Sequence, residues 1–233
     1  MFEATGISQL NLTQIVLAIG SLGTAAYGVV DVSKGFGGGV SNRGFGDIKK
    51  VVSQFIPAVS GASGGSALSL TSVLTTLRAN WLNGMALGDQ KSVAKALIKL
   101  NLNAASARAM AAATGVAETV LTSIAQKLPA GGDLTKEETD AYGRFDLLLS
   151  AVLDQGYQRA DQRYRNSAKL LAVPVAVGLA LLGAWAISPG PLLPPDAWRA
   201  VVGGLLATPL APVAKDLASG IQAGTKLAQA WKK

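Results

Sequence analysis

The chain contains no cysteine and no histidine among its 233 residues. These absences exclude disulfide bonds, thiol nucleophiles, histidine bases and the ordinary zinc sites built from those two residues. The glycine-rich stretch at residues 35–46 does not supply a nucleotide site either, because it lacks the Gly-Lys-Ser/Thr ending of a phosphate-binding loop. The sequence therefore predicts a protein that is not an enzyme and that carries no cofactor and no metal.

Charge is also scarce, since Asp, Glu, Lys and Arg make up only 15% of the chain, against about 25% in ordinary soluble domains. A helix on the surface of a soluble protein needs a polar face, whereas the hydrocarbon core of a bilayer excludes charge. The deficit is concentrated in long runs, which predict an integral membrane protein. The uncharged runs are residues 4–30, 51–77, 170–195 and 200–214.

The net charge of +7 comes from cations that flank these runs. A nucleic-acid surface would combine clustered cations with aromatic residues for stacking, so we expect no nucleic-acid partner. Cations beside apolar runs are instead typical of membrane proteins, in which Lys and Arg mark the cytoplasmic side and Trp lies at the interface. The predicted interface anchors are Arg163, Arg165, Lys169, Trp185, Trp198 and Trp231.

The first run predicts an N-terminal transmembrane helix within residues 1–31. Gly20, Thr24 and Gly28 are four residues apart, so they share a helix face on which another helix can approach closely in lipid. Gly178 and Gly183 are predicted to do the same in a later span. The alternative for the first run is a glycine-weakened helix buried in a soluble core.

Residues 32–58 are predicted to form a glycine-rich loop followed by a short interfacial helix. In this interpretation Asp47 caps the helix, which runs from Ile48 to Ala58, and Phe36 and Phe45 lie at the membrane interface.

Residues 59–135 are predicted to be helical and mostly cytoplasmic. The uncharged part rich in Ser and Thr has three possible placements: a buried soluble helix, a re-entrant element or a pore-lining helix. Further along, Asp89 is expected to cap a helix, and an alanine-rich helix is expected over residues 104–128 before a break at Pro129. The candidate pore-lining hydroxyls are those of Ser69, Ser72 and Thr76.

A capping box of Thr135 and Glu138 predicts the start of a long cytoplasmic helix over residues 136–168. Nothing before Pro174 interrupts it, so an unbroken helix to Ile187 would be about 75 Å long. Residues 169–215 are predicted to form a transmembrane hairpin with a proline-rich turn, and residues 216–233 a basic amphipathic tail.

The hairpin turn contains no Lys or Arg, which places it outside and the C-terminus in the cytoplasm. The expected fold class is therefore an all-α, multi-pass integral membrane protein. Its alanine and glycine content favours a bacterial inner membrane. We expect an oligomeric membrane assembly, such as a pore or channel, with the lipid bilayer and further copies of the chain as partners. The alternatives are an anchor or scaffold that recruits a soluble or membrane protein, and a phage or injection-machine protein that inserts into membranes.

Overall fold

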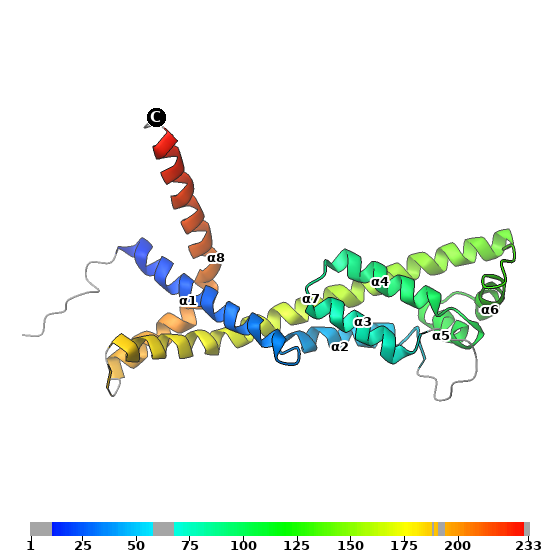
Figure 1. The fold of residues 1–233 in the computed structure, drawn as a ribbon, viewed down its shortest axis with the longest axis horizontal. Coiled ribbons are helices and arrows are strands. Elements are labelled where there is room, and N and C mark those ends of the chain that lie inside the picture. Colours follow the sequence, from blue (N-terminus) through cyan, green and yellow to red (C-terminus); the bar gives the residue numbers. More distant parts are fainter. Residues whose placement is uncertain (1–10, 58–67, 188, 191–193, 231–233) are drawn as a thin grey trace, which may run out of the picture. The chain divides into compact units, whose positions relative to one another are not determined.

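The computed structural model describes residues 11–57, 68–187, 189–190 and 194–230, and every regular element in these ranges is helical (Figure 1). The all-α prediction is therefore confirmed for the described residues. The elements are α1 (Leu12–Val32), the 3₁₀ turn η1 (Ser33–Gly35), α2 (Ser41–Val52), α3 (Leu70–Leu82), α4 (Leu87–Leu100), α5 (Ala104–Thr114), α6 (Glu118–Lys127), α7 (Lys136–Ile187) and α8 (Pro194–Ala230).

The chain divides into two compact units. The central unit comprises residues 41–164, and the terminal unit comprises residues 1–40 and 165–233. Helix α7 contributes its first part to the central unit and its second part to the terminal unit.

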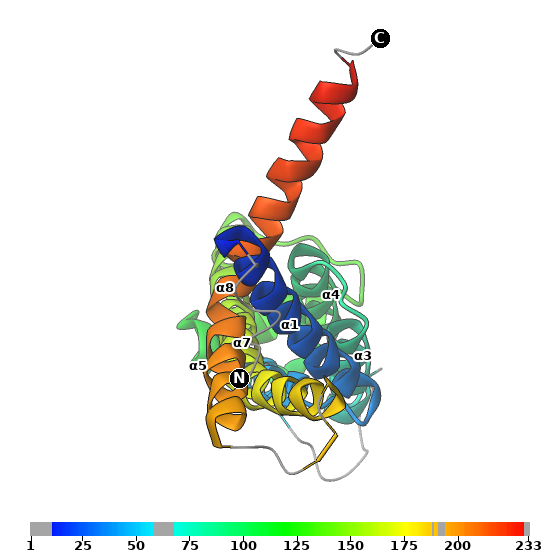
Figure 2. The same ribbon diagram turned by 90° about the vertical axis from the view of Figure 1, so that its left-hand side faces the viewer.

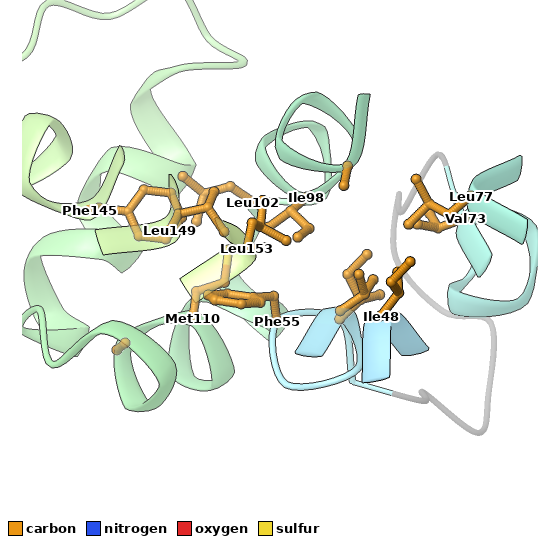
Figure 3. Close-up of a cluster of buried hydrophobic side chains, with 14 of the residues drawn as sticks. Ile48, Phe55, Val73, Leu77, Ile98, Leu102, Met110, Phe145, Leu149 and Leu153 are labelled. Atoms are coloured by element: carbon orange, nitrogen blue, oxygen red, sulfur yellow. The ribbon is translucent and has the colours of Figure 1, made fainter. Parts of the chain in front are cut away.

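The core of the central unit consists of large apolar side chains from α2 to α7 (Figure 3). Phe145, Leu149 and Leu153 are four residues apart on α7, so they form one buried stripe against which the shorter helices pack. Their partners include Ile48 and Phe55, Leu77 of α3, Ile98 of α4 and Met110 of α5. This is the packing expected of a domain that folds in water.

The start of α7 matches the predicted capping box. The Thr135 backbone N–H donates to Glu138 Oε2 at 2.8 Å, and the Glu138 N–H donates to Thr135 Oγ1 at 3.2 Å. The helix then continues without interruption to Ile187, through Pro174. The sequence left an unbroken helix over residues 136–187 possible, and the structure contains one.

Helix α2 corrects the expected glycine-rich loop. It begins at Ser41 rather than Ile48, so Asp47 lies in the middle of the helix and does not cap it. Phe45 was expected at the membrane interface, but it lies in the central core with only 8% of its surface exposed. Gly44 lets this segment pack as a helix against α7, because a Cβ at this position would come within 2.6 Å of the Ala160 carbonyl oxygen. The glycine serves close helix packing, not loop flexibility.

Two other helix boundaries also differ from the sequence-based expectation. Helix α4 begins at Leu87 with Ala86 as its N-cap, and Asp89 lies in its first turn. The alanine-rich helix expected over residues 104–128 is two helices, because Gly115 adopts a left-handed conformation (φ 68°) that ends α5.

Candidate functional site: a small-residue interface in the terminal unit

Three helices in the structure are long and apolar enough to cross a membrane. Among the described residues they are Leu12–Gly35, Lys136–Ile187 and Pro195–Ala223, and each overlaps one of the three spans expected from the sequence. Two of them, α1 and α8, run along one another in the terminal unit (Figure 2).

Glycine lets α1 and α8 approach at backbone distance. A Cβ added at Gly20 would lie 2.0 Å from Ala214 Cβ, and one added at Gly23 would lie 2.0 Å from the Ala207 carbonyl oxygen. Real side chains do not occupy such separations, so the glycines are required for the contact as it stands. Contacts of this kind are typical of helices that pack in lipid, where van der Waals fit drives association.

The α8 side of this interface also consists of small residues. Gly204, Ala207, Ala211 and Ala214 follow one another at intervals of three and four, which keeps them on one helix face, and all four are buried. The second part of α7 reaches α8 at Gly204, where an added Cβ would lie 2.5 Å from the Cα atom of Val177. Small residues of α8 thus allow close contacts with both α1 and the second part of α7.

Large apolar side chains of the terminal unit point away from this interface. In water such an arrangement would bury little apolar area and expose much of it, which opposes folding. In hydrocarbon the outward residues are solvated by lipid and the small inner residues fit together. Exposed large residues of the described helices include Leu12, Val29, Val32, Leu170, Leu182, Trp185, Ile187, Trp198, Leu205 and Val213.

The five residues expected to mediate helix packing have different positions. Gly20 faces α8. Thr24 is exposed, and its hydroxyl donates to the Gly20 carbonyl of its own helix at 3.1 Å. Gly28, Gly178 and Gly183 have nothing within 4 Å of an added Cβ. Of these five residues, Gly20 lies at a close contact between helices of the same chain, and a helix-packing role in lipid stays a prediction for all five.

Sequence reasoning missed Gly23 and the α8 face that it meets. The signal was present in the spacing of 204, 207, 211 and 214, which is a continuous small-residue stripe. A search for residues exactly four apart does not find Gly23. The buried face of α1 combines intervals of three and four, and it consists of Gly20, Gly23, Ala26 and Val30.

The expected interface anchors are exposed where the structure describes them. Arg163 forms an ion pair with Asp47 of α2 at 3.2 Å within the central unit. Arg165 and Lys169 are exposed on α7, and Trp185 and Trp198 are more than half exposed. Trp231 lies outside the described residues. Their location at a bilayer interface stays a prediction.

The expected pore-lining hydroxyls lie at the start of α3. Ser69 caps this helix, because its Oγ accepts a hydrogen bond from the Ser72 N–H at 3.1 Å. Thr76 is exposed and donates to the Ser72 carbonyl at 3.2 Å. The opposite face of α3 packs into the central core through Val73, Leu77 and Trp81; the pore-lining role stays a prediction.

Ion pairs hold the helices of the central unit to α7. Asp146 accepts hydrogen bonds from Lys95 at 2.6 Å and Lys99 at 3.0 Å. Burial alone would raise the pKa of Asp146, but these bonds outweigh it and lower the pKa. Asp154 pairs with Lys91, one turn earlier on α4.

Glu138 links α6 to the start of α7. It accepts hydrogen bonds from Lys127 at 2.7 Å and from the Ser123 hydroxyl at 2.6 Å, in addition to the capping bond from Thr135. The Lys127 bond and then the Ser123 bond are the main reasons that the pKa of Glu138 falls to about 2.

No protein-family model matches this chain, and neither a curated protein nor a solved structure shows significant similarity to it.

Proposed function

We propose that this protein is an oligomeric integral membrane protein that holds its central unit at the cytoplasmic face of a bacterial inner membrane. The observation that carries the proposal is the inverted packing of the terminal unit, with glycine and alanine inside and large apolar residues outside. Lipid is the solvent that suits such a surface. The polar surface and apolar core of the central unit suit water.

A second small-residue face of α1 supports the oligomer. Ala18, Ser21, Ala25 and Gly28 are separated by three, four and three residues, so they form a stripe on the face opposite Gly23. All four are exposed in the chain. Such a stripe offers a second helix the same close approach that Gly20 and Gly23 offer α8. The simplest candidate for this second helix is α1 of another copy of the chain.

The hydroxyl groups of α1 favour a scaffold over a conducting pore. Ser21 donates to the Leu17 carbonyl at 2.7 Å, and Thr24 donates to the Gly20 carbonyl at 3.1 Å. A hydroxyl that is bonded to its own helix is satisfied in lipid or against another helix, so it does not require a water-filled passage. These hydroxyl groups are therefore explained without a conducting pore. We favour a scaffold whose central unit recruits another protein.

Membrane insertion is tested by extraction of cell membranes with alkaline carbonate. We expect the protein to stay in the pellet and to enter solution only with detergent. Release of the untreated protein into the supernatant would contradict the proposal.

Oligomerisation is tested by measuring the mass of the detergent-solubilised protein by light scattering. The wild type should be larger than one chain, and Ala25→Leu combined with Gly28→Leu should reduce it to one chain. Gly178→Leu combined with Gly183→Leu is the matched control, because it adds two leucines at open glycines of α7. If only the α7 variant dissociates, the interface lies on α7 and the α1 stripe is not the contact.

A further inference from the structure

Helices α2 and α7 of the central unit meet along a tightly packed seam. A Cβ added at Gly44 would lie 2.6 Å from the Ala160 carbonyl oxygen, and one added at Gly156 would lie 2.7 Å from a methyl carbon of Val51. The start of α2 therefore meets Ala160 and its end meets Gly156, which comes earlier on α7, so the helices run antiparallel. The Asp47–Arg163 ion pair, at 3.2 Å, closes the outer edge of the same seam.

Cations surround that ion pair. On α2, Arg43 lies four residues before Asp47 and Lys50 lies three residues after it, so both share its face of the helix. On α7, Arg159 lies one turn before Arg163 on the same side. Arg43, Lys50, Arg159 and Arg163 are all exposed, whereas Asp47 is mostly covered. We call these five residues the seam patch.

The seam patch has a large positive excess. Four cations surround one carboxylate, which gives a local charge of +3. The neighbouring carboxylates of α7 do not offset it, because Asp154 and Asp161 lie on the other flank of the helix, where Asp154 pairs with Lys91. Concentrating like charges on an exposed surface opposes folding unless an anion accompanies them.

Both helices of the patch lie next to candidate spans in the sequence. Helix α7 continues without a break from Arg163 into the uncharged run that begins at Leu170. Helix α2 begins at Ser41, soon after α1 ends at Val32. In a membrane protein, cations beside the spans on the cytoplasmic side meet the phosphates of anionic lipids.

We propose that the seam patch binds the headgroups of anionic phospholipids, with Arg43, Lys50 and Arg159 contacting the phosphates and Arg163 held in place by Asp47. Planar guanidinium groups suit phosphate oxygens because they donate two parallel hydrogen bonds. The proposal rests on the membrane insertion proposed above and adds the class of lipid that the protein selects.

The test uses the full-length protein in a neutral detergent, titrated with phosphatidylglycerol or with phosphatidylcholine of the same acyl chains. Bound lipid is counted by native mass spectrometry. We expect the wild type to bind phosphatidylglycerol more tightly. Each cation near an anionic lipid contributes a factor of roughly five. The variant R43Q/K50Q/R159Q should therefore bind phosphatidylglycerol roughly a hundredfold more weakly and bind phosphatidylcholine as before.

A charge-matched control removes three exposed cations elsewhere on the same helices. K49Q/K136Q/R144Q loses the same net charge from α2 and α7 but leaves the seam patch complete. It should keep the wild-type affinity for phosphatidylglycerol. An equal loss in both triple variants would overturn the proposal, because net charge and not this patch would then account for binding.

Two further arms separate the remaining outcomes. The charge-retaining variant R43K/R159K should bind phosphatidylglycerol more weakly than the wild type but more tightly than R43Q/K50Q/R159Q, because lysine keeps the charge and loses the paired donors. A loss as large as in R43Q/K50Q/R159Q together with a lower melting temperature would assign the two arginines to folding and overturn the lipid role. Inorganic phosphate at the lipid concentration should not displace phosphatidylglycerol; displacement would show a site for free phosphate and would also overturn it. Carbonate extraction of R43Q/K50Q/R159Q should still leave the protein in the membrane, whereas release of the wild type would refute the proposed function itself.

Discussion

The two units of this protein use apolar residues in opposite ways. The central unit buries Phe55, Phe145 and Leu149 and leaves its charges outside. The terminal unit buries Gly23, Ala207 and other small residues, and exposes its leucines and tryptophans. Hydrophobic burial explains the first unit, but it cannot explain the second, because burying an alanine removes little apolar area from water. The comparison shows that two helical units of one chain can differ in the size of the residues that they bury and expose, and it is this difference that supports the proposed lipid environment of the terminal unit.

The largest expected effect concerns the core of the central unit. Phe145→Ala should destabilise this unit by about 4 kcal/mol, because Phe145 is fully buried and its removal leaves a cavity. The measurement is the thermal or urea unfolding of the detergent-solubilised protein by circular dichroism. Leu147→Ala, at a position 72% exposed and only two residues away, should change stability little. Equal losses would show that the core is not organised as described.

The next effect compares two exposed leucines on α7. Leu182 is 62% exposed in the terminal unit, and Leu147 is 72% exposed in the central unit. Leu182→Arg should cost about 3 kcal/mol of membrane insertion, because arginine is poorly solvated in hydrocarbon. Leu147→Arg should be tolerated, because the proposed function places this exposed position in water. The fraction of protein inserted, measured by carbonate extraction, checks this pair. If both variants remain inserted to the same extent, the two leucines do not lie in different solvents.

A third effect sharpens the description of packing within the terminal unit. Gly23→Leu should weaken the contact between α1 and α8 by about 2 kcal/mol, because the added side chain meets the Ala207 backbone. Leu at Gly203 of α8 should leave that contact intact, since an added Cβ there has nothing within 4 Å. Limited proteolysis in detergent reports the loosening of α1. Matching protease sensitivity in the two variants would argue against the close approach.

The smallest effect is a pH dependence that belongs to the central unit. The pKa of Glu138 falls from 4.5 to about 2 on folding. Its ionised form therefore stabilises the unit above pH 4.5, and this contribution is lost as the pH falls towards 2. Glu138→Gln should lower the melting temperature at neutral pH and reduce its decline in acid. Glu137→Gln, at the exposed neighbouring position, should leave the acid decline as it is in the wild type.

Much of this architecture follows from local sequence signals. Three of the four uncharged runs lie in the three candidate spans of the described residues, and the Thr135–Glu138 capping box gives the start of α7. Both signals are local, and no distant residue is needed to interpret them. The small residues of the terminal unit were also visible in the sequence, and Gly20 lies where α1 approaches α8.

The errors arose where tertiary packing determined the outcome. Gly44 reads as a loop residue, but its lack of a side chain lets α2 lie against Ala160. Gly115 reads as one more small residue in an alanine-rich helix, but its backbone turns left-handed and ends α5. In both cases glycine permits two local conformations. At Gly44 the contact with Ala160 selects the helical one, whereas Gly115 ends its own helix through a local bond to the Ala111 carbonyl.

The contact between α1 and α8 has a consequence for biosynthesis. Gly23 and Ala211 are roughly 190 residues apart in the sequence, and the ribosome adds about 5–20 residues per second. Helix α1 is therefore synthesised many seconds before α8, and the entire central unit emerges and can fold in the interval. Throughout that interval the glycine face of α1 is available to a chaperone, to an insertase or to α8 of a neighbouring chain. Exchange of α8 between nascent chains is thus a route to dimers that needs no surface beyond the one already used within a single molecule.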